Sequence, residues 1–183
     1  MMNSVGNEFL QTAVRRLKYY KDLGDKTIQR LSDEELHYQY NQESNSIAVV
    51  IQHMAGNMLS RWTNFLTTDG EKFWRQRDDE FTVHDFSKQQ LIELWEKGWI
   101  CFFKAMAALR EDDLLKTVYI REEGLSVIDA INRQLAHYPH HVGQIIYIGR
   151  MIKGPVWESL SIPKGDSIKY NQGSAGKDPA KKF

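Results

Sequence analysis

Four long segments of this chain repeat apolar residues at the spacing of an amphipathic helix, and this pattern limits the fold more than any other feature. They cover about residues 5–23, 44–66, 87–109 and 126–152 of the 183-residue chain. Apolar residues that recur three or four positions apart lie on one face of a helix. Four helices of this length, with no strong strand candidate between them, predict an all-α helical bundle.

The residues that flank these segments favour helix ends. Ser44, Asn45 and Ser46 are candidate caps at the start of the second segment, and Ser87 and Ser126 stand at the start of the third and fourth. A serine in this position accepts a hydrogen bond from a free backbone amide of the first helical turn. We expect Gly24 to end the first helix and Gly154 to end the fourth.

The connections indicate how the bundle is built. Residues 25–45 and 67–86 make connections too long for a minimal up-and-down bundle, so we expect at least one long crossover connection. Residues 1–154 are therefore expected to form a four-helix bundle. Residues 155–183 are expected to form a C-terminal tail that packs partly on the bundle.

Two shorter elements are also predicted. Ser32, followed by Glu35 three residues later, has the pattern of a capping box and indicates a helix start within the first connection. Thr117–Ile120 is rich in β-branched and aromatic residues and is expected to be extended. We expect the chain to turn at Glu123-Gly124.

Composition narrows the classes of partner. The chain has 24 basic and 24 acidic residues, and no extended basic stripe indicates a nucleic-acid partner. No apolar run approaches the roughly 20 residues that span a bilayer, and the N-terminus lacks the pattern of a secretory signal. Cys101 is the only cysteine, which excludes an internal disulfide. These features predict a soluble cytoplasmic protein that binds neither nucleic acid nor membrane.

Three histidines indicate a metal site. His137 and His141 lie four residues apart, so both rings project from one face of the fourth helix. His53 lies in the apolar second segment, where a polar ring is otherwise unexpected. If these two helices pack together, three neutral imidazoles converge on one divalent ion and leave positions open for water or substrate.

Each of these histidines also has a non-functional interpretation. A single histidine such as His53 is more often a core residue with its hydrogen bonds satisfied than a metal ligand. An isolated histidine pair four residues apart is a surface coincidence about as often as it is a pair of metal ligands. His140 points roughly 100° away from His141 on an ideal helix, which favours a surface position. A zincin motif would need glutamate where Tyr138 stands, and a di-iron bundle would need two Glu-x-x-His units on inward faces. The sequence fits neither of these metal-binding patterns.

Polar residues near the histidines have candidate supporting roles. Gln134 and Gln144 continue the face of the histidine pair and are candidate hydrogen-bond partners of the metal ligands. The candidate anion-binding residues are Arg61, Arg75 and Arg77. Ion pairs with Asp78 and Glu80 are the favoured interpretation of these arginines.

Several motifs resemble the DinB/YfiT-like superfamily of bacterial four-helix proteins. The histidine in the second helix, the His-x-x-x-His of the fourth and the string His140–Gln144 are similar to that superfamily, in which arginine usually stands where this chain has Val142. Longer pieces, Gln52–Trp62, Asp69–Asp78 and Leu160–Gly165, resemble the DUF1572 subfamily. The resemblance covers nearly the whole chain.

The resemblance implies a DinB-like bundle, often a homodimer, in which His53, His137 and His141 form the metal triad. Nickel or zinc is the expected metal, with iron or manganese as alternatives. Some relatives are thiol transferases that use bacillithiol, mycothiol or glutathione, so the first functional hypothesis is a metal-dependent thiol transferase with a small thiol cosubstrate. The second is a non-catalytic stress-related or interaction protein whose metal site is structural or vacant.

Overall fold

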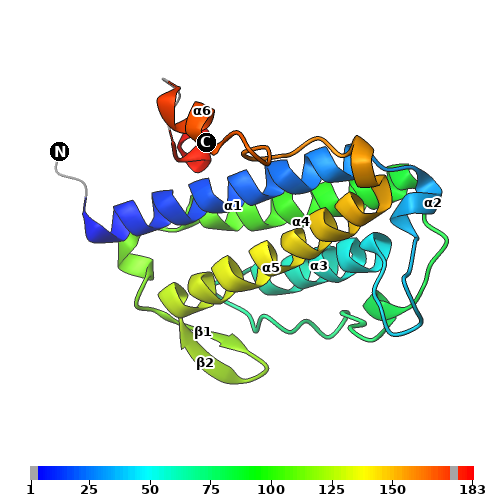
Figure 1. Cartoon of the computed structure of the whole chain (residues 1–183). Coiled ribbons are helices and arrows are strands. Elements are labelled where there is room, and N and C mark those ends of the chain that lie inside the picture. The colour runs from blue at the N-terminus through cyan, green and yellow to red at the C-terminus, as the bar shows by residue number, and fades with distance from the viewer. Residues whose placement is uncertain (1–3, 174–176) are drawn as a thin grey trace.

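The computed structural model describes residues 4–173 and 177–183. Four long helices lie alongside one another in a bundle (Figure 1), and they are α1 (Val5–Gln29), α3 (Ile47–Trp62), α4 (Lys88–Ala108) and α5 (Val127–Lys153). The prediction of an all-α bundle is therefore confirmed. A two-stranded hairpin at one end is the sheet found among the described residues.

Local sequence explains where the helices begin. Ser46, Ser87 and Ser126 each accept a hydrogen bond from a backbone amide in the first turn of the helix that follows. Ser32 and Glu35 form the predicted capping box, which starts the short helix α2 (Asp33–Leu36). Each cap satisfies amides that the helix itself leaves without a partner.

The packing of the helices explains the long connections. The main neighbours of α1 are α5 and α4, and the main neighbours of α3 are also α4 and α5. The chain therefore crosses the bundle between α1 and α3, as the crossover prediction requires. The connection from α3 to α4 contains the 3₁₀ helix η1 (Asp79–Phe81), which contacts α3.

The predicted end of the first helix is wrong. Gly24 lies inside α1, which continues to Gln29. A Cβ atom added at Gly24 would lie 2.6 Å from Cζ2 of Trp95, a buried residue of α4. The glycine allows α1 and α4 to approach closely and does not end the helix.

Gly24→Ala is expected to destabilise the fold although alanine favours helix. Alanine gains about 1 kcal/mol in helix propensity, but overpacking a core typically costs about 1–3 kcal/mol. The indole of Trp95 cannot move freely because its Nε1 donates to Asp25 at 2.6 Å. Gly143→Ala is the matched control, since nothing lies within 4 Å of the added Cβ. Thermal unfolding should give a lower Tm for Gly24→Ala and an equal or higher Tm for Gly143→Ala; the reverse order would contradict this packing.

The turn of the hairpin lies two residues earlier than predicted. Strand β1 (Thr117–Ile120) pairs antiparallel with β2 (Glu123–Ser126), so Glu123 and Gly124 belong to the second strand. The turn is made by Arg121 and Glu122, whose φ values are +55° and +65°. The carboxylate of Asp69 accepts hydrogen bonds from both of their backbone amides, at 2.9 and 2.8 Å. This contact holds two residues that are not glycine in the left-handed region.

The C-terminal tail runs back along α1 (Figure 1). It contains the helix α6 (Ser167–Gln172) and two short 3₁₀ helices, Gly154–Val156 and Pro179–Lys182. Asp178 accepts a hydrogen bond from Arg16 of α1 at 2.6 Å, and the side chain of Ala180 is fully buried.

A further 3₁₀ turn, Glu111–Asp113, follows α4. No helix in the described part of the chain is long and apolar enough to cross a membrane.

Candidate metal centre

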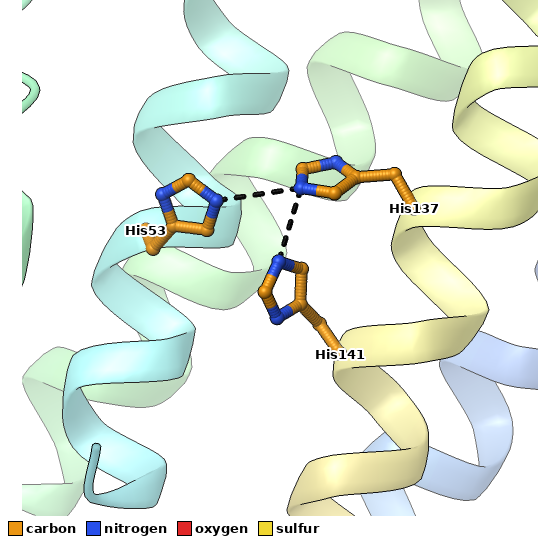
Figure 2. A group of neighbouring side chains, drawn as sticks. All are labelled: His53, His137 and His141. Carbon is orange, nitrogen blue, oxygen red and sulfur yellow. Dashed lines mark hydrogen bonds between the residues drawn. The ribbon is translucent and has the colours of Figure 1, made fainter. Parts of the chain in front are cut away.

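The three predicted histidines lie together between α3 and α5. The Nε2 atom of His137 is 3.4 Å from Nε2 of His53 and 3.0 Å from Nε2 of His141 (Figure 2). The candidate ligand atoms of all three rings lie within 4.8 Å of one another. The histidine pair comes from successive turns of α5, and His53 faces it from α3.

The outer ring nitrogens define the tautomers of two rings. Nδ1 of His53 lies 3.0 Å from a carboxylate oxygen of Glu80, which can only accept a hydrogen bond. Nδ1 of His141 lies 2.7 Å from the carbonyl oxygen of Gln144. Both Nδ1 atoms therefore carry the proton, and both Nε2 atoms present a lone pair toward His137.

This arrangement fits a divalent metal ion. A hydrogen on Nε2 of His137 can point directly at only one of the two facing lone pairs, whereas a cation among the rings would satisfy all three nitrogens. With metal–nitrogen bonds of about 2.1 Å, ligands at right angles are about 3.0 Å apart and tetrahedral ligands about 3.4 Å apart. The separations of 3.4 and 3.0 Å from His137 are of this size, and the three ligand atoms together span no more than 4.8 Å. Metal ligation by His53, His137 and His141 itself stays a prediction.

Burial keeps the pair on α5 neutral, as metal ligation requires. Burial, together with the neighbouring His141 and His53, lowers the pKa of His137 to about 3. Burial also lowers the pKa of His141. Neither ring has to lose a proton at neutral pH before its Nε2 atom can bind a cation.

An ion pair behind His53 fixes the orientation of its ring. Arg75 donates two hydrogen bonds to Glu80, from Nε at 2.7 Å and from Nη2 at 2.9 Å, and the Arg75 side chain is only 2% exposed. Burial alone would raise the pKa of Glu80, but the bonds from Arg75 and His53 hold it below its usual value. A carboxylate on the outer nitrogen of a ligand histidine is a common arrangement in metal sites.

A glycine makes room for this carboxylate. A Cβ atom at Gly56, one turn of α3 after His53, would lie 2.1 Å from Oε1 of Glu80. Only glycine therefore lets the η1 segment place Glu80 against His53. The role of Glu80 toward His53 was not predicted from the sequence.

Tyr138 locks α5 to α3 beside the histidines. Its hydroxyl accepts a hydrogen bond from Nε1 of Trp62 at 2.9 Å and donates one to the side-chain oxygen of Asn57 at 3.2 Å. The Tyr138 side chain is fully buried. This network fixes the position of His137, the preceding residue of α5, relative to α3.

The other candidate residues have different outcomes. Gln144 bonds to His141 as predicted, whereas the buried side-chain oxygen of Gln134 has no hydrogen-bond partner in the described residues. His140 is exposed, as expected. Arg75 is buried and pairs with Glu80, as predicted, whereas the buried Arg61 pairs with Glu71, a partner that was not predicted. Arg77 lies 3.8 Å from Asp78, and both of these side chains are exposed.

An open cleft of about 470 Å³ adjoins the centre. His53 and His137 form part of its wall, and His140 lies at its margin. A small molecule in the cleft can therefore reach His53 and His137, two of the three candidate ligands.

Comparison with known proteins places the chain in a family. Residues 4–166 match the model of a family described as "Protein of unknown function (DUF1572)". The chain belongs to the DUF1572 family. This DUF1572 protein is also similar to the crystal structure, at 2.01 Å resolution, of a DinB-like protein from Bacillus cereus ATCC 10987. The match has a TM-score of 0.61 and 19% sequence identity, and it covers 87% of this chain and 99% of that chain.

The structural match shows that the DUF1572 protein has a DinB-like fold, as the sequence motifs implied. At this level of identity the structural match establishes the fold alone. Comparison with curated proteins gives no match. The reaction therefore has to be argued from the site.

Proposed function

We propose that this DUF1572 protein is a metal-dependent enzyme of the DinB type that transfers a small thiol to an electrophilic substrate. The observation that supports it is the convergence of three imidazole rings beside an open cleft, whose wall includes His53 and His137. A purely structural metal usually has four protein ligands, and the cluster found in the described residues has three. The donor set suits nickel or zinc, with iron or manganese as alternatives.

The chain's own residues account for the pre-organisation of this site. His53, His137 and His141 would hold the ion, Glu80 and Gln144 orient two of the rings, and Tyr138 holds the two helices in register. A bound divalent ion supplies Lewis acidity and lowers the pKa of a thiol that reaches it. The thiol would release its proton to solvent, its sulfur would form a bond to an electrophilic carbon, and the leaving group would depart with the electrons of the bond that breaks.

The test combines metal analysis with a transfer assay. The purified protein is stripped with chelator, loaded separately with nickel, zinc, iron or manganese, and analysed for metal per chain. Each form is then assayed with glutathione or bacillithiol and an aryl chloride, a reaction that joins sulfur to the ring and releases chloride. We expect one metal ion per chain and chloride release that depends on it. One ion per chain without turnover of any thiol would favour the non-catalytic alternative.

A homodimer is also proposed, because the family resemblance implies it. Sedimentation velocity should then give twice the mass of one chain at micromolar concentration. A single species with the mass of one chain would contradict the dimer without affecting the metal proposal.

A further inference from the structure

We infer that the cleft beside the three-histidine centre binds the carboxylate of a small molecule that also carries a neighbouring O–H or N–H group. Arg133 and Arg77 would be the charged residues that attract it. The inference deepens the proposed function, since it depends on that function only in treating the bound molecule as a substrate. The cleft itself and its charge are independent of any metal.

The wall of the cleft is strongly basic. Five arginines line it, and none of the residues that line it is acidic. Three of the five, Arg61, Arg75 and Arg121, form ion pairs with only two carboxylates, those of Glu71 and Glu80. One oxygen of Glu71 lies near all three guanidinium groups. Three guanidinium groups therefore share two carboxylates in this part of the wall.

The two remaining arginines are available to a ligand. Arg133 forms no ion pair or hydrogen bond with any of the described residues, and it is exposed on α5 at the cleft. Arg77 has only the distant contact with Asp78 and lies over the ring of Phe81, with its guanidinium carbon 5.3 Å from the ring centre. A guanidinium group offers paired N–H donors that match a carboxylate.

Two buried polar atoms in the same wall lack hydrogen-bond partners. Nη1 of Arg75 makes no hydrogen bond, with the nearest carboxylate oxygen that of Glu71 at 3.6 Å, and the side-chain oxygen of Gln134 is an acceptor without a donor. Gln134 is only 2% exposed, and both residues line the cleft. Buried polar groups are seldom left unpaired, so each of these atoms indicates a missing partner.

Together these atoms distinguish between anions. Sulfate, which carries no proton at neutral pH, presents only acceptor oxygens and would set one of them against the oxygen of Gln134. A hydroxy acid or an amide-bearing acid presents its carboxylate to arginine and its O–H or N–H to Gln134. The wall therefore favours a carboxylate with an adjacent donor over sulfate.

The test uses metal-free protein, so that its result does not depend on the metal proposal. Isothermal titration at fixed ionic strength compares tartrate, which has hydroxyls beside its carboxylates, with succinate, which lacks them, and with sulfate, which has no donor at all. Tartrate should bind most tightly, with an advantage over succinate of about two- to tenfold from the extra hydrogen bond. Gln134→Leu should remove that advantage.

Arginine variants locate the bound anion. Arg133→Gln should weaken tartrate binding about tenfold or more, because a hydrogen bond to a charged group is lost. Arg150→Gln is the matched control, since Arg150 is an exposed arginine of the same helix well away from the cleft. Equal effects of the two substitutions, tighter binding of sulfate than of tartrate, or no tartrate binding at millimolar concentration would each overturn the inference. Loss of metal binding or of thiol transfer with the tartrate result intact would overturn only the proposed function.

Discussion

Replacement of His137 by alanine is expected to abolish stoichiometric metal binding. Its Nε2 atom is the one that both other rings face, at 3.4 and 3.0 Å. Zinc sites with four ligands bind with roughly 10–16 kcal/mol, so one ligand contributes on the order of 3 kcal/mol, or about a hundredfold in affinity. Competition with a chromophoric chelator measures this loss directly.

His140→Ala is the matched control for that experiment. His140 lies on the same helix, three residues from His137, but its exposed ring is outside the triad. Its removal should leave one metal ion per chain. Metal should also raise the Tm of the wild type and of His140→Ala, because a ligand that binds only the native state stabilises it. Similar metal affinities for the two alanine variants would rule out the site described here.

Glu80→Ala is expected to have the largest effect on stability of the site substitutions considered. It leaves the guanidinium of Arg75, whose side chain is 2% exposed, with only the Glu71 contact at 3.6 Å. Removing one partner of a buried ion pair typically costs about 3–5 kcal/mol. Urea denaturation of the metal-free protein measures the free energy of unfolding without the contribution of metal.

Asp79→Ala provides the comparison for Glu80→Ala. Asp79 belongs to the same 3₁₀ helix, but its carboxylate is largely exposed and makes only surface contacts. Its replacement should change the free energy of unfolding by no more than about 0.5 kcal/mol. Equal stability of the two variants would mean that the Arg75–Glu80 pair does not hold this connection in place.

Local chemistry made most helix starts predictable. Ser32, Ser46, Ser87 and Ser126 cap helices at the positions expected from the sequence, because a cap involves only the next few residues. The end of α1 was not predictable in the same way. Gly24 has the same local signal whether it ends a helix or admits Trp95, and the choice depends on a residue about seventy positions away.

The hairpin turn had the same limitation. Arg121 and Glu122 have none of the usual preference for the left-handed backbone, and Glu123-Gly124 is the stronger local turn signal. The turn forms two residues earlier because Asp69 binds its two backbone amides. Sequence reasoning has no access to that contact before the fold is known.

The candidate metal centre was likewise predictable only in part. Helical periodicity places His137 and His141 on one face, and the Gln144 contact follows from the same spacing. Glu80 comes from an irregular connection whose path is set by packing. The missed signal was Gly56, a glycine one helical turn from His53 that indicates a close approach by another segment.

The most direct test of the account is an X-ray absorption spectrum of the metal-loaded protein. It should show three imidazole nitrogen ligands at about 2.0–2.1 Å, with oxygen ligands in the remaining positions. The same spectrum of His137→Ala should lose this imidazole signal. A spectrum dominated by sulfur scattering, or one without imidazole ligands in the wild type, would contradict a metal centre built from His53, His137 and His141.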